Sequence, residues 1–174
     1  MKIIKFIFFS VLFFVMLMAF LPKENIYYFF ENKLFEKGIS LNEESTKEGL
    51  FGLDLSGIDV LYLGDSVARI GQIDAFFGIL YNKVALASAN PSKNLQNFVP
   101  QVERINALYT PFYPTKVFLK GEGGFGSISG SYSIFSKKIS LTLNPASDFA
   151  RRYPMLNSNF KNVDGRLVYE LSFK

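Results

Sequence analysis

The stretch SISGSYSIFSKKISLTL, residues 127–143, decides what kind of fold this chain adopts. Its first half alternates serine with larger or apolar residues, and its second half alternates apolar residues with serine and threonine. Strict alternation places the two kinds of side chain on opposite faces of a β-strand. A turn at residues 136–137 joins the halves, so the stretch predicts a β-hairpin with one polar and one apolar face. The apolar face is predicted to hold Ile128, Tyr132, Ile134, Ile139, Leu141 and Leu143.

Alternation recurs along much of the chain on both sides of this hairpin. Residues 51–55 and 58–62 both alternate, but the apolar positions change from odd to even numbers after Gly57, as a bulge or turn would produce. Residues 167–173 alternate again and are entered through the turn pair Asp164-Gly165. A sheet whose second face is rich in serine, threonine and lysine can leave that face to water. The pattern predicts a mostly antiparallel sheet.

Two segments between the expected strands carry helical signals. The apolar residues of 95–109 recur at steps of three and four, which predicts a helix, although Pro100 inside it requires a kink or a late start. Asn144 and Pro145 resemble the N-cap and first residue of a short helix over 146–153. The prolines of 110–115 predict an extended connection. The expected fold class is therefore α+β, mainly β.

The amino-terminal residues have a different composition. Residues 6–21, FIFFSVLFFVMLMAFL, are uncharged, and a helix over residues 3–21 is about 28 Å long, close to the thickness of the hydrocarbon core of a bilayer. Lys5 lies near one end, where its side chain reaches the headgroups. This segment predicts a membrane anchor. Its anchoring positions are Ile3, Phe6, Phe9, Val11, Phe13, Val15, Leu17, Phe20 and Leu21.

Two alternatives compete with an anchor. A cleaved signal peptide has a similar basic start and apolar run, but it ends in a pair of small residues, and Leu17 occupies the wrong place for such a site. A buried core helix is disfavoured, because a domain of this size rarely encloses a helix that is apolar on every side. Lysines flank the span on both sides, so their count does not set its direction. The short basic leader favours a large domain outside the cytoplasm.

Pro22 ends the apolar run, and residues 24–37 predict a second helix that Gly38 terminates. Its apolar stripe consists of Ile26, Tyr27, Phe30 and Leu34. The stripe fits a helix lying on the membrane surface and a helix covering one end of the sheet equally well. The expected organisation is an anchor (1–22), a juxtamembrane amphipathic helix (23–38) and a β-rich domain (39–174).

Composition excludes most catalytic chemistry. The chain has no cysteine and no histidine, which rules out the usual zinc sites, haem ligands, disulfides and Ser-His-Asp or Cys-His nucleophiles. We therefore expect no enzyme, no cofactor and no metal site. The carboxy-terminal half is basic, but only Arg151 and Arg152 beside Tyr153 approach the Arg-aromatic clustering of nucleic-acid binding, so no nucleic-acid partner is expected.

Three short motifs resemble catalytic or cofactor signatures. The run LGDS at residues 63–66 resembles the first block of the GDSL-type hydrolases, but Ser66 has no histidine to activate it, so a turn between strands is the better interpretation. The spacing of Gly121, Gly123 and Gly126 fits the dinucleotide fingerprint, but a strand follows where a helix is needed, which favours a tight hairpin or a sharply curved sheet edge. Ser158 and Lys161 form a Ser-x-x-Lys string without its supporting motifs.

The layout of residues 1–145 resembles the type II secretion system protein N family and its AsmA-like relatives. The resemblance rests on the anchor ending in LP, EKGISL (36–41), GLFGLDLSGIDVLYL (49–63), VARIGQIDAFFGILYNKVALASA (67–89) and GEGGFGSISGSYSIF (121–135). The chain departs from the family in its short length and its lack of tryptophan. The resemblance implies a single-pass protein of the bacterial inner membrane with a curved β-domain in the periplasm, and no active site.

Two functions follow as expectations. The first is a non-catalytic envelope component, an accessory or scaffold subunit that contacts the bilayer and other proteins of a type II secretion-like export apparatus. The second is an AsmA-like lipid-binding or lipid-transfer protein, in which the apolar residues of the 127–143 hairpin line a groove for an acyl chain. An ordinary core is the favoured interpretation of the same six residues, and an open apolar groove would favour the second function.

Overall fold

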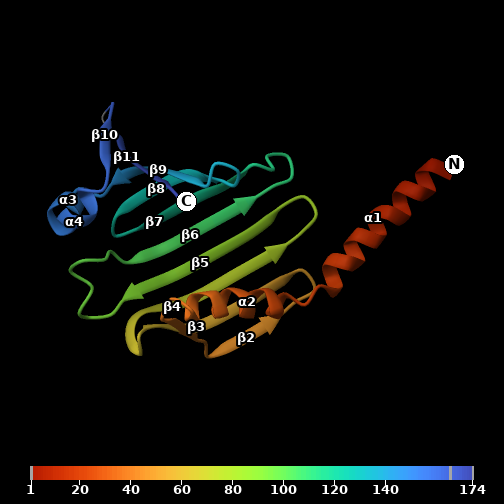
Figure 1. Ribbon diagram of the computed structural model, residues 1–174, viewed down its shortest axis with the longest axis horizontal. Helices are drawn as coiled ribbons and strands as arrows, with labels where there is room; N and C mark the ends of the chain where they lie inside the picture. Colours follow the sequence, from red (N-terminus) through yellow and green to blue (C-terminus); the bar gives the residue numbers. More distant parts are fainter. Residues whose placement is uncertain (1, 165, 174) are drawn as a thin grey trace.

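A computed structural model describes residues 2–164 and 166–173 of the chain. Helix α1 (Lys2–Phe20) and helix α2 (Lys23–Phe35) come before all the strands. They are separated at Pro22, whose backbone is extended with ψ of 99°, because proline removes a helical hydrogen bond and clashes with the preceding turn. Figure 1 shows α1 projecting away from the β-sheet, while α2 lies on it. The described part of α1 has no buried residue.

All the described strands belong to one sheet, in which every paired strand is antiparallel. The sheet order is β1-β3-β4-β5-β6-β7-β8-β9-β11-β10, with β2 also paired to β3. The strands are β1 (Ile39–Asn42), β2 (Ser45–Glu48), β3 (Gly52–Tyr62), β4 (Asp65–Phe77), β5 (Asn82–Pro91), β6 (Val102–Tyr109), β7 (Lys116–Gly123), β8 (Gly126–Ser133), β9 (Lys138–Pro145), β10 (Lys161–Val163) and β11 (Arg166–Ser172). The mainly β, antiparallel fold class predicted from the sequence is confirmed.

The sheet has two ends, which we name by the helices beside them. The α1 end holds the connections β2–β3, β4–β5, β6–β7 and β8–β9. The α3 end holds the connections β3–β4, β5–β6 and β7–β8, and the short helices α3 (Phe149–Arg152) and α4 (Pro154–Asn157). In Figure 1, α1 leaves the sheet on the right, and α3 and α4 lie on the left.

The central hairpin forms as its sequence predicts. Strands β8 and β9 pair over their whole length, with Ser129 opposite Thr142 on the polar face and Ile128 opposite Leu143 on the apolar face. Lys137 takes a positive φ of 48° in the turn between them. The glycine motif also forms the expected hairpin, in which Gly123 pairs with Gly126. Only glycine fits position 126, because φ is +102° and a Cβ atom there would lie 2.3 Å from the Asn144 carbonyl oxygen.

The shift of the apolar positions from odd to even numbers at Gly57 has counterparts in the neighbouring strands. Leu55 pairs with Ile73 and Ile58 pairs with Ile70, so both strands place two residues between successive apolar positions. Gly57 absorbs the irregularity with φ of +65°, and Ser88 of β5 has φ of +58°. The strands continue beyond these irregular positions, and their apolar side chains on both sides of them lie on the same face of the sheet.

The predicted helix over 95–109 is wrong. Residues 92–99 form turns, closed by bonds such as the Val99 amide to the Leu95 carbonyl, and β6 begins at Val102. The register of β6 shifts between Val102 and Arg104, which inserts an extra residue between Val102 and Ile105. The three-residue step therefore comes from a bulge, and it imitates a helical spacing.

Two further expectations need correction. A short helix does follow β9, but β9 runs through Asn144 and Pro145, and the helix begins only at Phe149 with Asp148 in the N-cap position. The connection at 110–115 is turned instead of extended, since the Tyr113 amide donates to the Thr110 carbonyl. Strand β11 follows Asp164 as predicted, while Gly165 of the expected turn pair lies outside the described residues.

Candidate functional site: the apolar face of the sheet

The strand registers trace one continuous apolar face across the sheet. Residues opposite each other in an antiparallel pair lie on the same face, so the face can be followed from strand to strand through the pairs Leu55–Ile73, Ile73–Leu86, Leu86–Ile105 and onward. The apolar face comprises Leu53, Leu55, Ile58, Ile70, Ile73, Ala75, Val84, Leu86, Ala89, Val102, Ile105, Ala107, Val117, Leu119, Ile128, Tyr132, Ile139, Leu141, Leu143, Leu167, Tyr169 and Leu171.

Helix α2 covers one part of this face. Tyr27 is buried with Leu53, Leu55 and Ile58 in a common cluster, which places the helix across the face at β3 and its neighbours (Figure 1). The contact is incomplete. A cavity of about 270 Å³ remains between α2 and the sheet, and Ile26 and Phe30 contribute to its wall. Of the predicted helix stripe, Tyr27 is buried, Ile26 and Leu34 are half-buried, and Phe30 is exposed.

Polar contacts hold α2 in place beside the cavity. The Tyr27 hydroxyl donates a hydrogen bond of 2.8 Å to Glu43. Burial, together with this hydrogen bond to a carboxylate, raises the pKa of Tyr27 well above its usual range, so the hydroxyl remains a donor. Glu31 also lines the cavity. Burial, with a smaller contribution from the charge of Glu43, raises the pKa of Glu31.

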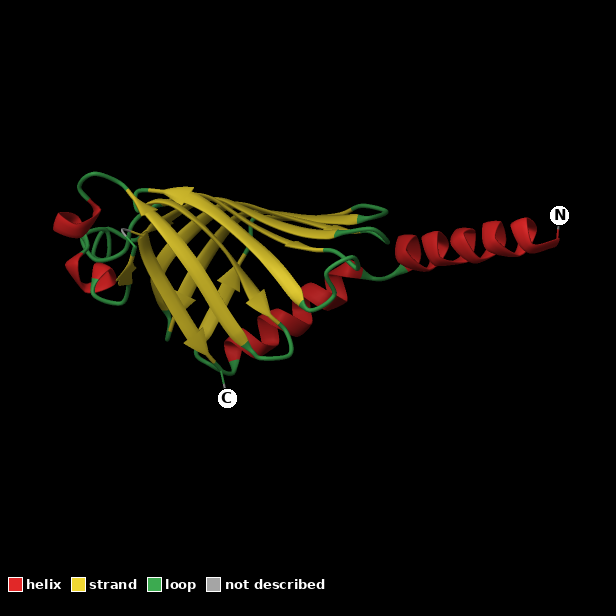
Figure 2. Ribbon diagram, turned by 90° about the horizontal axis from the view of Figure 1, so that it is seen from above, coloured by secondary structure: helices red, strands yellow, loops and turns green. Residues whose placement is uncertain are grey.

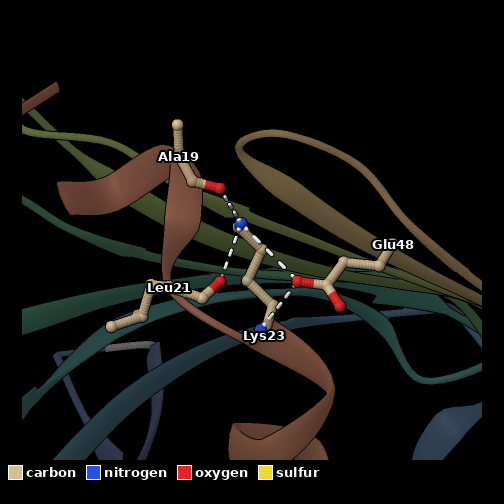
Figure 3. Close-up of polar contacts among 4 residues, drawn as sticks. All are labelled: Ala19, Leu21, Lys23 and Glu48. Carbon is tan, nitrogen blue, oxygen red and sulfur yellow. Dashed lines mark hydrogen bonds and ion pairs between the residues drawn. The ribbon is translucent and has the colours of Figure 1, made fainter. Parts of the chain in front are cut away.

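Lys23 joins the two helices to the sheet (Figure 3). Its side chain is only 1% exposed. The ammonium donates to the carbonyl oxygens of Ala19 at 3.0 Å and Leu21 at 2.9 Å, and it lies 3.6 Å from Glu48 Oε1. The backbone amide of Lys23 donates to the same carboxylate oxygen at 2.9 Å. A buried cation at the carboxyl end of a helix satisfies carbonyls that have no other partner there and complements the helix dipole.

The importance of Lys23 did not emerge from the sequence, where it was only one of the lysines after the apolar run. Its position four residues beyond Ala19 is the spacing at which a side chain returns to the last turn of a helix. That spacing was the available signal. Glu48 had no comparable signal, because its approach depends on the pairing of β2 with β3.

Aromatic residues from α3 and the loops cover the α3 end of the face. Phe149 is nearly inaccessible and clusters with Tyr153, Phe125 and Leu143. The ring centroids of Phe149 and Tyr153 are 5.9 Å apart, within the range that favours aromatic pairs. A smaller cavity of about 180 Å³ lies at this end, lined by Phe125, Leu141 and Phe160 among other apolar residues. The lining of this cavity is entirely apolar.

A strip of the apolar face lies between the two covers. It consists of Val84, Leu86, Ile105, Ala107 and Leu119, and we call it the open strip. Val84 is 44% exposed and the other four are half-buried. In the described part of the chain, these residues belong to neither of the two buried clusters. Exposed contiguous apolar surface often marks a binding site, so the open strip is the candidate binding site.

The structure divides the six hairpin residues that the sequence placed on one face. Ile128 and Leu143 lie in the aromatic cluster at the α3 end, and Leu141 lines its cavity. Tyr132 and Ile139 pair with each other toward the α1 end, where the Tyr132 ring lies 6.3 Å from that of Phe173. The prediction that Ile134 lies on the apolar face is wrong, because β8 ends at Ser133 and Ile134 is exposed in the following turn.

The remaining predicted positions are on or next to α1. Ile3, Phe6, Phe9, Val11, Phe13, Val15, Leu17 and Phe20 lie in the helix, and Leu21 follows its last residue. Ser66 of the LGDS motif is exposed at the start of β4, directly after the turn at Leu63 and Gly64. Among the described residues, no group of three or more Asp and Glu residues is arranged to hold a metal ion.

No protein-family model matches this chain, no curated protein matches it, and no solved structure matches it.

Proposed function

We propose that this protein is tethered to a membrane by α1 and binds the apolar chain of a lipid-like molecule along the apolar face of its sheet. The open strip is the observation that carries the proposal. Its side chains are all aliphatic, so they offer contact with hydrocarbon and no hydrogen-bonding partner for a polar ligand. The proposal assigns no reaction to the protein.

The two cavities favour a ligand that lies along the face. Their volumes are about 270 and 180 Å³, below the range of about 300 to 1,000 Å³ that encloses a typical small molecule. Neither cavity alone would hold a whole lipid. The open strip begins at the α2 cavity, which Val84 also lines, and extends toward the cavity at the α3 end, so an extended chain could contact the strip with its ends near the two covers.

The proposed function is better served by a curved sheet than by a flat one, and we include that curvature in the proposal. Figure 2 supports it, because the sheet seen from above bends around the side on which α2 lies. A sheet of this many strands twists and coils unless other contacts flatten it. A trough would bring the walls of the apolar face closer to a bound chain and shield it from water.

Membrane attachment is supported by the length and composition of α1. The helix has 19 residues, enough to cross a bilayer, and none of its most apolar part is buried against the rest of the protein. A signal sequence near the amino terminus would meet the same criteria. Alkaline carbonate extraction tests the assignment: an anchored chain stays in the membrane pellet with its amino-terminal residues intact, and a released chain lacking them would contradict it. Placing the β-domain in the periplasm is part of the same proposal.

Native mass spectrometry of the full chain released from detergent tests lipid binding. We expect adducts with the masses of membrane lipids on the wild-type protein. Leu119→Glu places a charge on the open strip and should remove the adducts. Ser129→Glu is the matched control, because it introduces the same charge at an exposed position on the polar face. Equal adducts on both variants, or none on the wild type, would contradict the proposal.

A second candidate is the scaffold role in an export apparatus. The observation in its favour is the presence of exposed apolar side chains at the α3 end, among them Leu63, Phe98 and Met155. Such residues commonly mark protein–protein contacts. Crosslinking in cells followed by purification should then recover an envelope protein, and Phe98→Ser with Met155→Ser should reduce its yield. Recovery unchanged by these substitutions would contradict the scaffold role of this surface.

A further inference from the structure

The connections at the α1 end carry an unusual set of exposed side chains. The tips are GLF (49–51), GILY (78–81), TPFYPT (110–115) and IFSK (134–137), and Lys137 is the only charged residue in them. We call these four connections the rim. Phe135 is 82% exposed and Phe112 is 75% exposed. The exposed large apolar residues of the rim are Leu50, Ile79, Leu80, Tyr81, Phe112, Tyr113, Ile134 and Phe135.

Ordinary loops do not explain the rim. Loops lie on the surface in contact with water. The connections at the α3 end also expose apolar residues such as Leu63 and Phe98, but that end of the sheet carries more charge overall. Its charged residues are Lys93 in the β5–β6 connection, and Asp148, Arg151 and Arg152 at or in helix α3. The two ends of one sheet therefore differ in the surface that they present, and the apolar end is the one at which α1 leaves the domain (Figure 1).

Lysines stand directly behind the apolar tips. Lys83, Lys116 and Lys138 occupy the first two positions of the strands β5, β7 and β9, which begin at the rim. Lys138 pairs with Glu170 at 2.9 Å. Lys83 and Lys116 have no ion-pair partner within the part of the chain that the structure describes. Aromatic tips followed by lysines match the two layers of a bilayer surface, in which the acyl boundary lies beneath anionic headgroups.

The contacts of Lys23 fix the position of the rim relative to the carboxyl end of α1. Lys23 binds the carbonyls of Ala19 in α1 and of Leu21 just after it, and also Glu48. Glu48 is the final residue of β2 and immediately precedes the first rim connection. The end of the apolar helix and the rim are thus held together at one end of the sheet. A bilayer that contains α1 would have its surface at this end.

We propose that the rim inserts into the interfacial layer of an anionic bilayer, beside the point where α1 enters it. This inference rests on the proposed membrane attachment of α1 and adds a second contact with the same bilayer. It also supplies a route for the proposed ligand. Val117, Tyr132 and Ile139 carry the apolar face from the open strip toward the rim, so an acyl chain would pass from the bilayer onto the face without crossing water.

The chain contains no tryptophan, so a single introduced tryptophan reports its own depth. We would place the full-length variants Phe112→Trp, Phe135→Trp, Phe13→Trp and Met155→Trp in vesicles of phosphatidylglycerol and phosphatidylcholine that contain lipids brominated near the headgroup or near the chain end. All four positions are exposed, so the substitutions leave the described core unchanged. Phe13 reports on the α1 span, and Met155 reports on the α3 end.

We expect emission at 112 and 135 to be lost mainly with shallow bromines and at 13 mainly with deep bromines, with no loss at 155. Quenching at 13 without quenching at 112 and 135 would contradict insertion of the rim into the bilayer and leave the proposed membrane attachment of α1 intact. An absence of quenching at 13 would contradict both the membrane attachment of α1 and the insertion of the rim that rests on it. Quenching at 155 equal to that at 135 would also overturn the inference, because it would mean that the two ends do not differ.

Reversing the charge of the rim lysines distinguishes binding to anionic lipid from nonspecific hydrophobic adsorption. In the Phe135→Trp background, Lys83→Glu with Lys116→Glu should weaken the quenching of the introduced tryptophan in vesicles rich in phosphatidylglycerol. Lys93→Glu at the α3 end should leave that quenching unchanged. Equal effects of the rim and control substitutions would overturn the part of the inference that concerns the lysines.

Discussion

The two covers of the apolar face are built in different ways. At the α3 end, Phe149, Tyr153 and Phe125 form an apolar cluster around Leu143. At the other cover, a whole helix contributes a single buried apolar side chain, Tyr27, and the larger cavity lies beneath it. Its remaining fixed contacts are polar: the Tyr27 bond to Glu43 and the Lys23 bonds to Glu48 and to the end of α1.

This difference suggests that the covers have different roles. The α3 end contributes to the stability of the sheet, because its residues form part of the core. The α2 cover is joined by a few hydrogen bonds above a cavity, so it can shift with a smaller loss of apolar contact. In the proposed function, α2 is the part of the protein that adjusts to a bound chain. The following predictions test that contrast.

The largest expected effect is at Phe149. Replacing a fully buried phenylalanine by alanine removes its contacts and leaves a cavity, so Phe149→Ala should lower the free energy of unfolding by about 3–5 kcal/mol. Denaturant titration of the full chain in detergent, followed by circular dichroism, measures it. Met155→Ala in the exposed part of α4 is the control and should cost almost nothing. A loss at Phe149 no larger than that at Met155 would show that the α3 cover is not core.

A smaller and more local effect is expected at Lys23. Lys23→Met leaves the carbonyls of Ala19 and Leu21 without their donor, at a cost of about 1–3 kcal/mol. Hydrogen exchange should become faster in α2 and β2 and remain unchanged at the α3 end. Lys33→Met removes an exposed pair with Glu36 and should have little effect. Uniform acceleration across the sheet would contradict a local junction.

The Tyr27 hydroxyl should matter less. Tyr27→Phe keeps the ring in its cluster and removes the bond to Glu43, which should cost about 1 kcal/mol and increase exchange in α2. Because the cavity walls are retained, lipid adducts in native mass spectrometry should persist. A complete loss of adducts with unchanged exchange would mean that the hydroxyl contacts the ligand instead of fixing the helix.

The smallest effect concerns the polar face and pH. Asp54 and Asp74 are opposite each other on β3 and β4. A hydrogen bond with Asp74, and then burial and the charge of Asp74, raise the pKa of Asp54. A raised pKa of an acid in the folded state means that its stabilising contribution is present in acid and lost as pH rises through that pKa. Asp74→Asn should therefore raise stability at neutral pH by about a few tenths of a kcal/mol, and the gain should vanish as pH falls through the raised pKa of Asp54. A gain that persists in acid would contradict this cause.

The sequence predicts strands well where alternation is strict and poorly where the strands bulge. The hairpin at 127–143 was predicted with its two strands and two faces, because the residues of 127–133 and 139–143 follow the period of a pleated strand, although Ile134 belongs to the turn instead of the strand. At Val102 and Ile105 the extra residue in β6 created a helical spacing, and the strand was missed. The distinction depends on the pairing of β6 with β5 and β7, which local spacing does not contain.

The candidate site was only partly predictable for a similar reason. The apolar face of the hairpin follows from its own sequence, but the open strip combines β5, β6 and β7, whose registers are set by long-range pairing. Whether apolar residues form a core or an open surface depends on which elements cover them. That information resides in the positions of α2, α3 and α4, and no spacing along the strands reveals it.

The central claim is that an apolar chain occupies the open strip. Photo-crosslinking from benzoylphenylalanine in place of Leu119 in living cells, with the identical replacement of Ser129 as control, tests it most directly. We predict an adduct at position 119 with the mass of a membrane lipid or its acyl chain and no such adduct at position 129. A protein adduct alone at 119, or lipid adducts of equal yield at both positions, would contradict the claim.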